Sequence, residues 1–111
     1  MLFAHHRQPL LSIYWTVMPE KRRLVVEEAL ETWGNGALFF DGLDAAIVGM
    51  GQQFTDPALV VYDEGRILKI LMDQGMDRDE AFEFYSFNIA GSWAGENTPI
   101  IVTRWEEIEG T

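Results

Sequence analysis

The amino-acid sequence predicts a small single-domain α+β protein, in which about four helices pack against a short three-stranded mixed sheet. Its 111 residues are the length of one domain. Hydrophobic residues make up 48% of the chain, including 7 Phe, 4 Trp and 3 Tyr, which is enough for a core without disulfides or metals. Stretches with helical spacing alternate with short apolar runs bounded by glycine and proline, and this pattern predicts the order α-β-α-β-α-α-β.

The first helix is predicted over residues 19–33. Pro19 suits the first helical turn, where its missing N–H costs nothing. An apolar stripe with helical spacing follows, made of Val26, Ala29, Leu30 and Trp33. Two interpretations of residues 1–17 stay open. Either they belong to the natural chain, or they are an N-terminal extension upstream of a natural start at Met18, which leaves 18–111 as the single domain.

A buried strand and a short helix are expected next. Residues 37–40 form an apolar run between two glycine-containing turns, which is typical of a strand. Asp41 then resembles an N-cap, with Asp44 in the capping-box position three residues later. The helix that they open is expected to place Leu43, Ile47 and Met50 inward and to end at Gly49 and Gly51.

The second strand is predicted over residues 58–62, which are apolar on both faces. We expect it to lie parallel to the first strand, because a helix is predicted between them. Asp63 is placed to cap the following helix, whose stripe contains Ile67, Ile70 and Leu71. Gly75 and Met76 are placed for a Schellman ending of that helix.

Another helix is expected to begin at once, with a capping box of Asp77 and Glu80. One face of it would carry Ala81, Phe84, Tyr85 and Asn88. The glycines that follow end the helix, and residues 99–103 form the third predicted strand.

The formal net charge of −10 excludes several partners. A strongly acidic surface repels nucleic-acid backbones and anionic membranes, so we expect neither as a direct partner. Between residues 27 and 64 every charged residue is acidic: Glu27, Glu28, Glu31, Asp41, Asp44, Asp56, Asp63 and Glu64. This run is typical of a solubilising surface, and its alternative interpretation is a DNA mimic or a docking surface for a basic partner.

The residues for the common catalytic designs are missing from the sequence, so an enzyme is not the favoured interpretation. The chain has no cysteine, and its 2 histidines, His5 and His6, are adjacent and poorly placed to share a metal. Asp41 and Asp44 are weak candidates for a magnesium site, and a capping role explains them better. We therefore expect no cofactor and no metal.

The stretch 84–99 is the most unusual part of the sequence. Asn88 falls on an apolar helical stripe, where a buried amide needs hydrogen-bond partners, and the glycine-rich loop that follows could supply them. Trp93 lies between glycines and is expected to be exposed, as are many binding tryptophans. A polar and aromatic pocket is the functional interpretation, lined by Asn88, Trp93, Glu96, Asn97 and Thr98.

The chain also resembles small phage and prophage proteins of unknown function over roughly residues 38–102. The resemblance is carried by four short segments: DGLDAAIVG (41–49), VYD (61–63), ILM followed by GM (70–76) and DEA (79–81). Its most specific part is 84–99, which contains Phe87-Asn88, Gly91 and the run GENTP (95–99). It implies a phage accessory protein in the cytoplasm of a bacterial host. It implies no activity, cofactor or catalytic residue.

Three functions follow as hypotheses. The favoured one is a non-enzymatic phage accessory protein that binds a host protein. The alternatives are a small-molecule or nucleotide binder that uses Asn88 and the loop 95–98, and an acidic DNA mimic. Homo-oligomerisation stays open.

Overall fold

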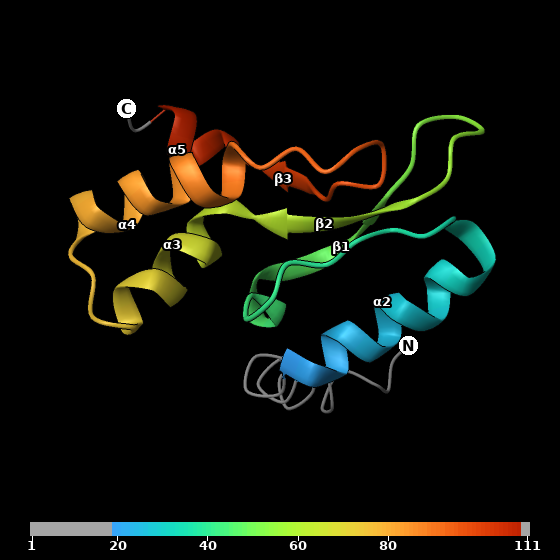
Figure 1. Ribbon diagram of the computed structural model, residues 1–111, viewed down its shortest axis with the longest axis horizontal. Coiled ribbons are helices and arrows are strands. Elements are labelled where there is room, and N and C mark those ends of the chain that lie inside the picture. The colour runs from blue at the N-terminus through green and yellow to red at the C-terminus, as the bar shows by residue number, and fades with distance from the viewer. Residues whose placement is uncertain (1–18, 110–111) are drawn as a thin grey trace, which may run out of the picture.

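A three-stranded sheet forms the middle of the structure, with one long helix packed along it and the other helices gathered at one end (Figure 1). The computed structural model describes residues 19–109. The elements in chain order are α2 (Pro19–Trp33), η1 (Asp44–Ala46), β1 (Ile47–Gly51), β2 (Leu59–Asp63), α3 (Glu64–Asp73), α4 (Arg78–Tyr85), η2 (Ser86–Ala90), β3 (Ile100–Val102) and α5 (Trp105–Glu109). A small α+β fold with four helices and a three-stranded mixed sheet is thus confirmed. The N-terminal extension proposed for residues 1–17 lies outside the described residues.

The sheet has the spatial order β1-β2-β3, with β1 and β2 antiparallel and β2 and β3 parallel. The expectation that the first two strands are parallel is wrong. Only residues 52–58 connect β1 to β2, and a parallel pair needs a crossover of about a dozen residues. The longer path from β2 to β3, through α3, α4 and η2, provides that crossover.

The segment before β2 differs most from the prediction. Residues 37–40 belong to no strand, and β1 forms at residues 47–51, where a helix was expected. Asp41 does not cap a helix, because the short 3₁₀ turn η1 has Leu43 at its N-cap without a side-chain hydrogen bond. The β-branched pair Ile47-Val48 favours an extended backbone once β2 is available as a partner.

The core lies on the central strand. Val60 and Tyr62, on one face of β2, are completely buried, and Ile67 and Leu71 from α3 belong to the same cluster. The Phe40 N–H donates a 2.8 Å hydrogen bond to Tyr62 Oη, which fastens residues 37–40 over the strand although they do not pair with it. None of the helices in residues 19–109 combines the length and hydrophobicity needed to cross a bilayer.

The predicted ends of α3 and α4 are confirmed. Asp63 caps α3 by accepting the Arg66 N–H at 2.9 Å. The helix ends in a Schellman motif, in which the N–H groups of Gly75 and Met76 bond to the carbonyls of Met72 and Leu71. Gly75 has φ +108°, a conformation that favours glycine.

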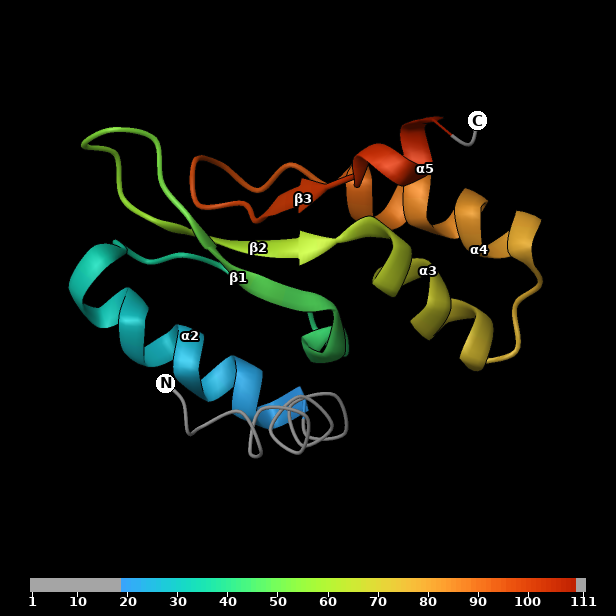
Figure 2. The same ribbon diagram turned by 180° about the vertical axis from the view of Figure 1, so that it is seen from behind.

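Asp77 and Glu80 then form a reciprocal capping box at the start of α4, with both hydrogen bonds at 2.9 Å. Seen from behind in Figure 2, α3, α4 and α5 gather at the end of the sheet where β2 and β3 finish. The C-terminal helix α5 is thereby brought beside α3 and α4, which follow one another in the chain.

Candidate functional site

The predicted pocket residue Asn88 lies on the surface, so the expectation of a buried amide is wrong. It belongs to η2, a π-helical turn that continues α4. The buried stripe runs through Ala81, Tyr85 and Ile89 in steps of four residues, which leaves Asn88 outside it. The Asn88 Nδ2 donates to the Phe84 carbonyl at 3.1 Å, one turn back in its own helix, and not to the glycine-rich loop.

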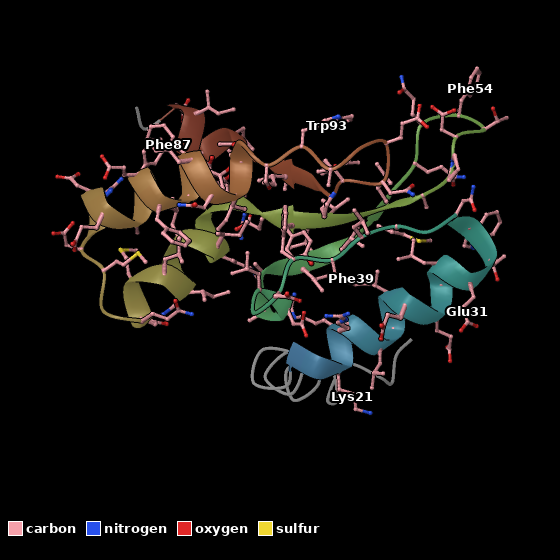
Figure 3. All side chains as sticks on the ribbon, in the orientation of Figure 1. Lys21, Glu31, Phe39, Phe54, Phe87 and Trp93 are labelled. Carbon is pink, nitrogen blue, oxygen red and sulfur yellow. The ribbon has the colours of Figure 1, made fainter. Side chains whose placement is uncertain are left out.

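The other four predicted residues belong to the loop before β3. Trp93 is 76% exposed, as expected (Figure 3). The Thr98 hydroxyl accepts the Ala94 N–H at 2.8 Å and donates to the Gly95 carbonyl at 2.7 Å, which closes the loop on itself. The Asn97 carbonyl accepts the Leu38 N–H at 3.0 Å, whereas the side chain of Glu96 is exposed. These bonds give the loop its shape.

The structure does not bring Asn88 into a common pocket with the loop. Asn88 lines a shallow groove together with Met76, Glu80, Glu83, Phe84 and Phe87, and this groove includes none of Trp93, Glu96, Asn97 or Thr98. The Thr98 hydroxyl and the Asn97 backbone carbonyl are already engaged with backbone groups.

Asp41 and Asp44 do not form a pair. Asp41 is exposed in a turn, whereas Asp44 opens η1 with its Oδ1 3.5 Å from Nη1 of Arg23. Arg23 also lies 3.5 Å from Glu27 and has its guanidinium 4.2 Å from the centre of the Phe39 ring. Within residues 19–109 no group of three or more potential ligands is arranged for a metal ion.

The acidic run between residues 27 and 64 is partly neutralised by arginines. Glu27 and Asp44 pair with Arg23, and the buried Asp63 pairs with Arg104. These three carboxylates are therefore not free to imitate the phosphates of a nucleic acid along one face.

A groove with a volume of about 880 Å³ lies between α3, α4 and α5. Its apolar lining comes from three consecutive elements and from the C-terminal helix: Leu68 and Met72 on α3, Phe82 on α4, Phe87 on η2 and Ile108 on α5. Phe82, Phe87 and Ile108 are 54%, 78% and 62% exposed. Such a concentration of exposed apolar side chains is typical of an interaction surface.

Charged side chains border these apolar residues. The groove lining includes four carboxylates, those of Glu64, Asp79, Glu83 and Glu107, against one guanidinium, that of Arg78. The Glu64 carboxylate also accepts a hydrogen bond from the Tyr85 hydroxyl. Burial and this hydrogen bond raise the pKa of Tyr85. The groove is thus apolar inside and acidic at its border.

The α5 wall is fastened by the pair formed between Asp63 and Arg104. Arg104 Nε lies 2.9 Å from Asp63 Oδ1, and Nη2 lies 3.3 Å from Oδ2. Burial alone would raise the pKa of Asp63. The hydrogen bonds from Arg104 and the Arg66 N–H, with the charges of both guanidinium groups, outweigh it and hold that pKa below its usual value. The Asp63 side chain therefore stays ionised although it is buried.

Close packing at Gly65 adds to this attachment. A Cβ at Gly65 would lie 2.5 Å from Glu107 Oε2, so the absence of a side chain leaves room for the Glu107 carboxylate beside the first turn of α3.

Sequence reasoning missed the groove, although Phe82, Phe87, Trp105 and Ile108 carried a signal. Each is a large apolar residue, and all four are exposed in the structure. No protein-family model, curated protein or solved structure matches the chain. The function must therefore be argued from the groove itself.

Proposed function

We propose that the protein is a non-enzymatic phage accessory protein that binds a host protein, in the cytoplasm of a bacterial host. The observation that carries the binding function is the groove between α3, α4 and α5, where Phe82, Phe87 and Ile108 are exposed inside an acidic border. The phage origin rests on the sequence resemblance over residues 38–102.

The partner is expected to present a basic surface to the groove. Four carboxylates face one guanidinium at the border, and the whole chain has a net charge of −10. Complementary charge accelerates encounter and rejects partners of the same sign. Aromatic side chains inside the border then supply contact area that is shielded from water, as in known binding hot spots.

Site-specific photo-crosslinking tests this function. Phe87 is replaced by p-benzoylphenylalanine in one variant and Phe54 in a matched control, because Phe54 is 98% exposed at the tip of the loop between β1 and β2 (Figure 3). This loop lies at the end of the molecule opposite α4. Irradiated bacterial cells that express each variant should yield a crosslinked host protein from position 87 and not from position 54.

The identified protein is then purified and titrated against the wild-type chain, Phe82→Ala and Phe54→Ala. Phe82→Ala should weaken binding by about tenfold, because it removes an aromatic contact inside the groove, whereas Phe54→Ala should leave the affinity unchanged. Equal crosslinking from both positions, or equal affinity of all three chains, would overturn the proposal.

A further inference from the structure

We propose that the groove between α3, α4 and α5 takes a basic amphipathic α-helix of the partner, with the apolar stripe of that helix against Leu68, Phe82 and Phe87. This inference rests on the proposed function, and it specifies the partner's chemistry and conformation. Three properties of the groove support it: the backbone hydrogen bonds of its walls on α3 and α4 are made within helices, these walls are about two to three helical turns long, and their charge is mainly negative.

The apolar part of the walls on α3 and α4 offers no backbone groups with which an extended peptide could pair. Leu68 and Met72 lie within α3 and Phe82 within α4, where the backbone N–H and C=O groups are used inside the helices. An extended peptide in this groove would therefore bury unpaired backbone groups, at a cost comparable to lost hydrogen bonds. A helix has its own backbone bonds already satisfied, so it can enter an apolar groove without that cost.

The length of the walls fits two to three helical turns. The 10 residues of α3 span about 15 Å and the 8 residues of α4 about 12 Å at the rise of an α-helix. Apolar residues at positions i, i+4 and i+7 of a bound helix cover about 11 Å along its axis, which matches these walls.

The border selects a basic helix. Asp79 and Glu83 lie one turn apart on α4, and Glu107 lies on α5, another wall of the groove. Lysines or arginines that flank an apolar stripe on both sides would meet carboxylates on both of these walls. A second copy of this chain brings a further net charge of −10, and an anionic lipid surface has the same sign, so both are disfavoured as occupants.

Three labelled peptides of about 14 residues, which span about 21 Å as helices, test this inference. The first has a leucine stripe flanked by lysines, the second carries glutamate in place of each lysine, and the third has the composition of the first with its leucines distributed around the helix. Fluorescence anisotropy with the purified full chain measures the affinity of each peptide.

The lysine peptide with the leucine stripe should bind about tenfold more tightly than either of the other two. Glu83→Lys should weaken its binding about fivefold, Phe82→Ala about tenfold, and Phe54→Ala not at all. Binding should also weaken as the salt concentration rises from about 0.05 to 0.3 M, because the border carboxylates of Asp79 and Glu83 are exposed. Circular dichroism confirms that each variant is folded before titration.

Equal affinity of the lysine and glutamate peptides would overturn the inference, as would failure of all three to bind. Analytical ultracentrifugation tests whether a second copy of the chain occupies the groove. A dimer that Phe82→Ala dissociates would also overturn the inference. If a host protein crosslinks at position 87 while the lysine peptide does not bind, this inference fails and the proposed function stands. If the peptide binds and no host protein crosslinks, the proposed function fails.

Discussion

The Arg104 guanidinium meets the carboxylate of Asp63 across 41 positions of sequence, with Nε 2.9 Å from Oδ1. The same carboxylate accepts the Arg66 N–H at the start of α3. One buried side chain therefore caps a groove helix and fixes the segment that leads into α5, another groove wall. The shape of the groove depends on this contact.

Substitution of Asp63 should destabilise the fold more than substitution of its partner. Asp63→Ala removes the cap of α3, which costs about 1 to 2 kcal/mol, and it also leaves Arg104 without its carboxylate. Arg104→Ala should cost less, since its side chain is half exposed and the cap remains. Urea unfolding measures both, with Lys69→Ala, which breaks an exposed pair with Asp73, as the control. An equal loss for Asp63→Ala and Lys69→Ala would contradict the role of the cap.

Acid should weaken the fold through the same group. The pKa of Asp63 is lower in the folded state than in the unfolded chain, so the unfolded state binds more protons at low pH. The stabilisation is complete above the unfolded value of about 3.9 and is lost as the pH falls through the folded value. The free energy of unfolding should therefore decline less steeply below about pH 4 in Asp63→Asn than in the wild type. Identical acid profiles for the two chains would refute this assignment.

The hydroxyl of Tyr62 should be worth about 1 kcal/mol of stability. It accepts the Phe40 N–H at 2.8 Å, and Tyr62 is completely buried. Tyr62→Phe keeps the ring and removes this acceptor, so that the Phe40 N–H loses its partner. Chemical denaturation should show a lower midpoint with an unchanged slope. A midpoint equal to that of the wild type would mean that water replaces the hydroxyl without loss.

Alkali should weaken the fold through Tyr85. Burial, the hydrogen bond to Glu64 and the charge of Glu107 all raise the pKa of this hydroxyl, so the folded state retains the proton longer than the unfolded chain. The stabilisation is present below the unfolded value of about 10 and is lost as the pH rises above it. Tyr85→Phe should flatten this alkaline decline, and a smaller slope should remain from Tyr62, whose pKa burial also raises. Thermal unfolding in buffers on both sides of about pH 10 measures how stability changes with pH. If the alkaline loss of stability is as steep in Tyr85→Phe as in the wild type, Tyr85 is not its cause.

Phe54 should be replaceable with a gain in stability. It has φ +54°, which is unfavourable for a residue with a large side chain, and its ring is almost fully exposed. Phe54→Asn should raise the free energy of unfolding by up to about 1 kcal/mol, because asparagine tolerates this conformation better. Gln53→Asn, next to it, is the control and should change little. A loss of stability in Phe54→Asn would show that the ring makes contacts that stabilise the loop.

The features that sequence predicted correctly are local ones. The Asp63 cap, the capping box of Asp77 and Glu80 and the Schellman ending at Gly75 each involve residues within a few positions of one another. Their physical causes lie in the backbone groups that every helix end leaves unpaired. A sequence pattern is therefore sufficient to place them.

The failures have a tertiary cause. Residues 47–51 form β1 because β2 lies beside them, and no local signal reveals this partner. The π-helical turn η2 changes which residue faces inward, so Ile89 is buried and Asn88 is not. The groove could not be predicted either, since three helices enclose it only after the sheet has brought the ends of β2 and β3 together.

The position of β3 has a consequence for biosynthesis. The β1–β2 hairpin is translated first and lacks its third strand until the ribosome has added residues 64–102, and a two-stranded hairpin alone is only marginally stable in water. During this interval the outer edge of β2 has unpaired N–H and C=O groups that another nascent chain could pair with. Slow translation of α3 and α4 would lengthen that vulnerable interval, so chaperone demand during synthesis should depend on the speed at which the segment between β2 and β3 is made.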